Sequence, residues 1–204
     1  MADRLPIESA LPVGAVDTRA SGWWAMIFTV ATEASLFAYL LFSYYYLAVQ
    51  PHLPGTFPQG GAPSLTLALP NTIILLASSV TMVWAQFNIE RDDNRRLIFG
   101  LAASIVLGVV FLVVQYFEWA EKSYSLSSST YSGLYYTITG FHMMHVVAGV
   151  IMLSAVLWWS ALGYFNRVRY APIHIAALYW HFVDAVWIAV FITFYITPRV
   201  GLSS

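Results

Sequence analysis

Leu97–Ala120 reads LIFGLAASIVLGVVFLVVQYFEWA, and Glu118 is the only charged residue in this stretch. A helix that crosses a bilayer needs about 20 consecutive, mostly apolar residues. Lipid offers the backbone no hydrogen-bond partners, so a spanning segment must satisfy its own N–H and C=O groups as a helix. The stretch therefore predicts a transmembrane helix.

Four further runs have the same character. Strands of a membrane barrel would be shorter and would alternate apolar with polar residues, and these runs do neither. The first connector, residues 50–64, holds four prolines and three glycines, a loop composition. The four further predicted spans are about 23–49, 69–88, 134–162 and 173–197, and the stretch at 97–120 is the third of the five in chain order.

The predicted fold class is all-α, an integral membrane bundle of five transmembrane helices. We find no internal repeat and no boundary that would divide it, so residues 23–197 form one membrane domain. Residues 1–22 are expected to be a polar cytoplasmic tail without a secretory signal, and residues 198–204 a short C-terminal tail.

Composition supports a membrane protein and excludes several other classes. The chain is 59% hydrophobic and 9% charged, whereas soluble domains carry about 25% charged residues. A net charge of −1 provides no basic surface for nucleic acid. The absence of cysteine excludes disulfides, thiolate zinc sites, iron–sulfur clusters and covalent c-type haem attachment.

The basic residues predict the orientation, because cytoplasmic loops carry an excess of Lys and Arg. The opposite side has only Lys122 and Arg199. We therefore expect the N-terminus in the cytoplasm and the C-terminus outside, on the periplasmic side. The residues assigned to the cytoplasm are Arg4, Arg19, Arg91, Arg95, Arg96, Arg167 and Arg169.

Ionisable groups at membrane depth are costly and are therefore functional candidates. Glu33 lies about 10 residues into the first span, roughly 15 Å deep at 1.5 Å per residue. His142 and His145 lie on one helix face through their i, i+3 spacing, and so do His181 and Asp184. Glu118 lies nearer the outer end of the third span, where the cost of burying a charge is smaller. The proposed buried polar network consists of Glu33, Asn71, Glu118, His142, His145, His181 and Asp184.

Three interpretations of this set remain open. The first is a metal or haem centre. A di-iron bundle would use a Glu-x-x-His pair from each of two helices plus two further Glu, and this sequence has no Glu-x-x-His. A di-haem cytochrome would need His pairs that face one another across helices at two depths, and the sequence has few histidines for this. Hydrogen bonding between helices is the favoured interpretation, and a proton or ion path is the third. A transporter would show broken helices or repeats, which the sequence lacks. We expect no catalytic, cofactor-binding or metal-ligating residue in this chain.

The same residues lie within phrases typical of one family. They are YWHFVDAVW at 179–187, TGFHMMHV at 139–146, NT followed by LASSVT at 71–81, QYFEW at 115–119, and Glu33 in the first span. These phrases occur in the same order as in cytochrome c oxidase subunit III, a subunit family of the haem–copper oxidases. The chain resembles that family over about residues 22–197. Glu33 matches that family's buried, carbodiimide-reactive carboxylate.

The resemblance implies a non-catalytic subunit of a proton-pumping terminal oxidase that reduces oxygen to water. Haem and copper would be bound by its partners, subunits I and II, and this chain would pack on subunit I, supporting proton uptake and stability. Further candidate partners are a subunit IV, a supercomplex, membrane lipids and a structural phospholipid. The expected location is the inner (plasma) membrane of a bacterial cell.

One departure keeps two alternatives open. Longer members of the family have seven helices, and this chain resembles their last five, the short bacterial form. Subunit III of a quinol oxidase and a subunit-III-like accessory protein of nitric oxide reductase resemble this short form as well. The presence of Glu33 favours the cytochrome c type.

Overall fold

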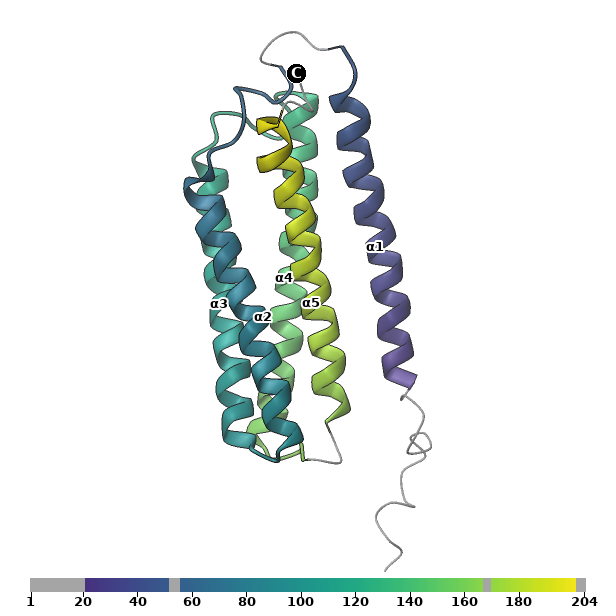
Figure 1. Cartoon of the computed structure of the whole chain (residues 1–204), viewed down its shortest axis with the longest axis vertical. Coiled ribbons are helices and arrows are strands. Elements are labelled where there is room, and N and C mark those ends of the chain that lie inside the picture. The colour runs from purple at the N-terminus through teal and green to yellow at the C-terminus, as the bar shows by residue number, and fades with distance from the viewer. Residues whose placement is uncertain (1–20, 52–55, 167–169, 201–204) are drawn as a thin grey trace, which may run out of the picture.

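The structure, a computed structural model, describes residues 21–51, 56–166 and 170–200. Within them it contains five long helices and no strand, and all five are long and apolar enough to cross a membrane (Figure 1). The predicted all-α bundle of five spanning helices is therefore confirmed. The helices are α1 (Ser21–Ala48), α2 (Leu65–Glu90), α3 (Asn94–Ala120), α4 (Thr130–Ala161) and α5 (Ala171–Phe191).

Helix α5 continues into two irregular turns. A π-helical turn covers Ile192–Ile196, and a 3-10 turn covers Thr197–Arg199. The Thr197 hydroxyl donates to the carbonyl of Ile192, five residues earlier, at 3.1 Å. Most of the two predicted tails, residues 1–20 and 201–204, lies outside the described residues, as do Arg4, Arg19, Arg167 and Arg169.

The helices begin earlier than the apolar runs that predicted them. Helix α4 begins at Thr130 because Ser129 and Ser132 form a capping box, in which each side chain accepts from the other's backbone N–H. At the start of α3, the Asp93 side chain accepts from the Arg96 N–H at 3.1 Å. Apolar residues mark only the part of a helix that lies in hydrocarbon, and helical hydrogen bonding continues to the polar cap.

Trp180 of α5 fills the centre of the bundle and is fully buried. Added Cβ atoms at Gly108 of α3 and Gly149 of α4 would lie 2.6 and 2.8 Å from its ring. The absence of side chains at these two positions therefore makes room for the indole between α3 and α4. The Trp180 N–H donates to the hydroxyl of Ser78 on α2 at 3.0 Å. Helices α2, α3, α4 and α5 therefore meet at Trp180.

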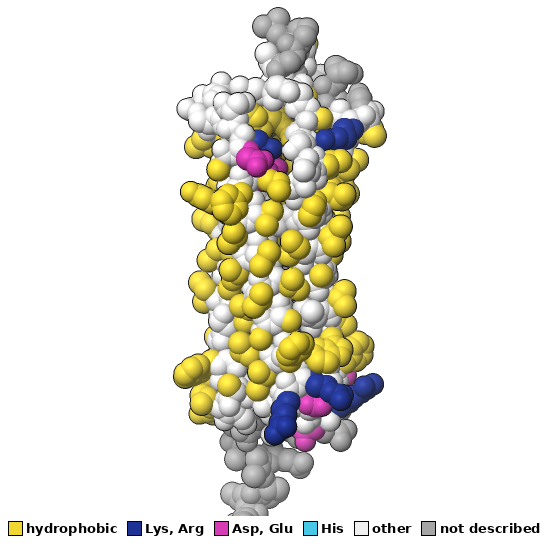
Figure 2. Space-filling view, turned by 90° about the vertical axis from the view of Figure 1, so that its left-hand side faces the viewer, with side chains coloured by type: hydrophobic (Ala, Val, Ile, Leu, Met, Phe, Trp, Pro, Cys, Tyr) yellow, Lys and Arg dark blue, Asp and Glu magenta, His cyan; other side chains and the backbone are white. Residues whose placement is uncertain are grey.

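On the face of the molecule shown in Figure 2, apolar side chains cover the middle, and charged side chains gather near the two ends. Large apolar residues are openly exposed along the sides, including Phe28, Val80 and Phe99 at 68–70% exposure. An apolar surface of this extent suits lipid and neighbouring membrane subunits. The chain is therefore a multi-pass membrane protein. Helix α1 lies at one side of the bundle, where it packs on α4 and α5 (Figure 1).

Candidate functional site

Glu33 of α1 pairs with His145 of α4. A carboxylate oxygen of Glu33 lies 3.0 Å from Nε2 of His145, and Nδ1 of the same ring lies 2.7 Å from the carbonyl oxygen of Phe141. Because a carbonyl can only accept, Nδ1 carries a proton. The bond at Nε2 therefore holds a single proton between the imidazole and the carboxyl group, and it joins α1 to the bundle.

His181 and Asp184 of α5 meet Ser79 of α2 in a second cluster. The Ser79 hydroxyl donates to Asp184 and lies 3.0 Å from Nδ1 of His181. Since the hydroxyl proton goes to the carboxylate, His181 donates to the serine oxygen. A nucleophilic serine needs the opposite arrangement, in which the histidine accepts the hydroxyl proton. This cluster therefore joins α2 to α5 and has no geometry for nucleophilic catalysis.

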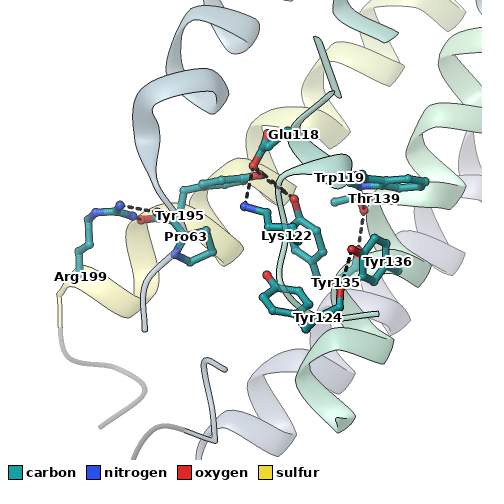
Figure 3. Close-up of polar contacts among 10 residues, drawn as sticks. All are labelled: Pro63, Glu118, Trp119, Lys122, Tyr124, Tyr135, Tyr136, Thr139, Tyr195 and Arg199. Atoms are coloured by element: carbon teal, nitrogen blue, oxygen red, sulfur yellow. Dashed lines mark hydrogen bonds and ion pairs between the residues drawn. The ribbon is translucent and has the colours of Figure 1, made fainter. Parts of the chain in front are cut away.

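Glu118 of α3 is the centre of a third cluster near the C-terminal ends of α3 and α5 and the N-terminal end of α4 (Figure 3). One of its oxygens accepts from Lys122 at 3.2 Å, from the Tyr135 hydroxyl at 3.3 Å and from the Tyr195 hydroxyl at 2.5 Å. The residue is only 2% exposed. Position along the span predicted a small cost for this carboxylate, whereas the packing of three helices buries it as deeply as an apolar core residue.

Hydrogen bonds to the backbone hold the surroundings of this carboxylate (Figure 3). The Tyr136 hydroxyl donates to the carbonyl of Tyr124 at 2.9 Å. Arg199 donates to the carbonyl oxygens of Tyr195 and Pro63, which closes this end of the bundle. Burial, together with the charges of Tyr136 and Glu118, raises the pKa of Tyr124 to about 12, so its phenol stays neutral at physiological pH.

The remaining two candidates lie in the interior of the bundle. His142 is fully buried among the rings of Phe37, Phe111 and Trp187, and its ring centroid lies 4.9 Å from that of Trp187. The side-chain amide of Asn71 on α2 donates to the carbonyl of Phe111 on α3 at 3.2 Å. The structure thus brings Glu33 and His145 together, and it places His181 with Asp184 in a separate cluster.

The donor sets do not converge on a site for haem or copper. His145 is engaged by Glu33, His181 by Ser79, and His142 is enclosed by aromatic rings. Among the described residues, no group of three or more His, Cys, Asp or Glu side chains is arranged to hold a metal ion. The described residues of these clusters do not fit either redox group, and their polar contacts link one helix to another.

Several partners of the candidate residues escaped the sequence analysis. Ser79 lies inside the quoted LASSVT segment, but a hydroxyl in an apolar helix gives no signal of its own. Lys122 follows Glu118 by four residues, a spacing that suggests an ion pair. Tyr135 and Tyr195 are two of 13 tyrosines, and only the packing of α4 and of the π-helical turn directs them at Glu118.

Comparison with known proteins places the chain in a family. Residues 16–198 match the family model described as cytochrome c oxidase subunit III. A protein of Synechocystis sp. named cytochrome c oxidase subunit 3 is 36% identical over 175 residues, covering 84% of this chain and 73% of the relative. Its namesake from Pongo pygmaeus is 32% identical over 196 residues, covering 94% and 71%. The chain therefore belongs to the cytochrome c oxidase subunit III family.

Proposed function

We propose that this chain is subunit III of a bacterial cytochrome c oxidase, a membrane subunit without redox centres of its own. The match to the family model over residues 16–198 carries this proposal. The relatives described above bear the name cytochrome c oxidase, which favours this function over a quinol oxidase subunit. In this proposal the chain spans the plasma membrane with its N-terminus in the cytoplasm, as the excess of basic residues there predicts.

Its role is to pack on subunit I, which together with subunit II binds haem and copper, and to support proton uptake and the stability of the complex. The Glu33–His145 pair supports such packing. About a third of the Glu33 side chain is exposed at the side of the bundle, at a depth where a polar group in lipid is costly. A neighbouring subunit or a phospholipid head group that covers it would lower this cost.

The experiment that tests the proposal is purification of the tagged chain from native membranes in mild detergent, followed by mass spectrometry and visible spectroscopy. Recovery with a haem–copper subunit I and a copper-bearing subunit II supports the proposal. A subunit IV or a supercomplex would be recovered in the same preparation. Recovery with nitric oxide reductase, with a quinol oxidase, or with no haem-bearing partner would contradict it.

A further inference from the structure

Among the buried side chains with polar atoms that have no hydrogen-bond partner in the described residues, five lie on α2, α3 and α4 between mid-span and the Glu118 end of the bundle. Their side chains are at most 2% exposed. Nearly every buried polar group in a folded protein has a partner, so seven such atoms in one region require an explanation. They are Asn71 Oδ1, Gln115 Oε1 and Nε2, Glu118 Oε2, Tyr131 OH, and His142 Nδ1 and Nε2.

These atoms follow one another along the facing sides of α3 and α4. On α3, Phe111, Gln115 and Glu118 are all buried and lie on one face at helical spacing. At 1.5 Å per residue, Gln115 is about 6 Å beyond Phe111 along the axis, and Glu118 is about 4.5 Å beyond Gln115. The three residues form a ladder from the middle of the span to its outer end.

Helix α4 runs in the opposite direction and supplies the other side of the ladder. Tyr135 is level with Glu118, because the two are hydrogen bonded. His142, seven residues along α4, is level with Phe111, seven residues back along α3, and their ring centroids are 5.8 Å apart. Gln115 therefore lies between the level of the imidazole and the level of the carboxylate.

Asn71 adds a third wall from α2. Its amide nitrogen donates to the carbonyl of Phe111, which is also the carbonyl at which the Gln115 N–H points within the helix. The Asn71 amide therefore lies beside the turn of α3 that runs from Phe111 to Gln115, the residue with two unpartnered side-chain atoms. Carboxamide, imidazole and carboxylate groups from α2, α3 and α4 thus lie within about two helical turns of one another along the bundle.

The mixture of donors and acceptors identifies the ligand by its chemistry. Gln115 Nε2 can only donate, Asn71 Oδ1 and Gln115 Oε1 can only accept, and a neutral His142 does one of each. A buried water molecule donates and accepts and makes about three hydrogen bonds to such groups. One water joins two groups roughly 5.5 Å apart, and the axial rise between Gln115 and Glu118, about 4.5 Å, is of the same order.

We propose that the core enclosed by α2, α3, α4 and α5 is a binding site for ordered internal water. The water connects His142 and Asn71 at mid-span, through Gln115, to the free oxygen of Glu118 near the outer end. Lys122 and Tyr195 engage the other carboxylate oxygen, so Oε2 is the oxygen of Glu118 that is left for water. The site lies within this chain alone and does not depend on which oxidase or reductase the chain joins.

The test is cryo-electron microscopy of the intact complex, purified through the tagged chain, at a resolution that shows ordered water. We expect density within hydrogen-bond distance of the Gln115 amide and of Glu118 Oε2. Gln115→Leu should remove the peak next to position 115. Ser104→Ala is the matched control, because Ser104 is buried on the same face of α3 and its hydroxyl bonds to Gly100, Ser78 and Thr81.

A wild-type map in which Asn71, Gln115 and His142 bond directly to one another, with no water peak between them, would overturn the proposal. Loss of the same peaks in Ser104→Ala would overturn it as well, since that result would mean general loosening of the bundle. The wild-type map alone decides the question if Gln115→Leu does not assemble. None of these outcomes depends on the identity of the copurifying subunits, so failure here leaves the proposed function to its own test.

Discussion

Helices α1 and α5 are similarly apolar, yet they occupy opposite positions in the bundle. In α1, three of 28 residues are buried, and in α5, 11 of 21 are buried. In water, equal hydropathy would favour equal burial, whereas lipid solvates an apolar helix as well as protein does. Hydropathy thus tells which segments enter the membrane, and packing and polar contacts decide which of them lies at the centre.

The two helices are held by different means. Helix α5 packs two buried indoles, Trp180 and Trp187, whose N–H groups donate to hydroxyls of α2. Helix α1 depends on a few contacts, among them the Glu33–His145 pair and the buried ring of Tyr44. We therefore expect substitutions in α5 to unfold the bundle and substitutions in α1 mainly to loosen one helix.

The largest effect is expected for Trp180→Ala. Removal of a fully buried indole leaves a cavity at the meeting point of four helices and should cost about 3–5 kcal/mol of unfolding free energy. Phe28→Ala in α1 is the control, because that ring is 68% exposed. Thermal unfolding of the purified complex in detergent measures both, and equal effects would abolish the distinction between the two helices.

Tyr195→Phe should rank second. It removes the hydroxyl that donates to the buried carboxylate of Glu118 at 2.5 Å, at a cost of about 1–3 kcal/mol. Tyr39→Phe in α1, at a position that is 71% exposed, should leave the unfolding free energy unchanged. If both variants unfold like the wild type, the outer cluster does not stabilise the end of α5.

Glu33→Leu should have a smaller effect, confined to α1. Loss of the bond to His145 should cost between about 0.6 kcal/mol, the average measured for hydrogen bonds between membrane helices, and about 1.7 kcal/mol, the largest such value. We expect the variant to shorten the active lifetime of the complex while initial turnover is retained. Glu33→Gln is the matched variant, because its amide can still donate to Nε2. A collapse of initial turnover in an assembled complex would indicate a catalytic role for Glu33 instead.

The smallest effect is expected for Tyr45→Phe, which tests the contact between the two helices directly. The Tyr45 hydroxyl, near the C-terminal end of α1, lies 3.1 Å from that of Thr193 in the π-helical turn that continues α5. Its loss should cost about 0.6 kcal/mol, the average for such bonds. Proteolysis in the α1–α2 loop should become slightly faster, and a loss as large as that of Tyr195→Phe would show that α1 is not the weakly held helix.

The amino-acid sequence alone predicts the number of helices, their approximate limits and the family. These properties depend on local composition and on short ordered phrases, which one chain displays without any knowledge of its packing. The same information identified the costly polar residues, because a charge within an apolar run is visible at any position. The sequence also predicted a small free-energy cost of burial for Glu118, because the distance of a residue from the end of its span was the only available measure of burial.

Which polar groups meet depends on how each helix is rotated and placed against the others, and no local pattern encodes this. Glu33 and His145 are 112 residues apart, and Ser79 and His181 are 102 apart. The division into separate clusters, the burial of Glu118 by tyrosines of two other helices and the central position of α5 follow from tertiary packing. In a membrane the arrangement of the helices depends on close packing and hydrogen bonds, because lipid is as apolar as the apolar side chains of a neighbouring helix.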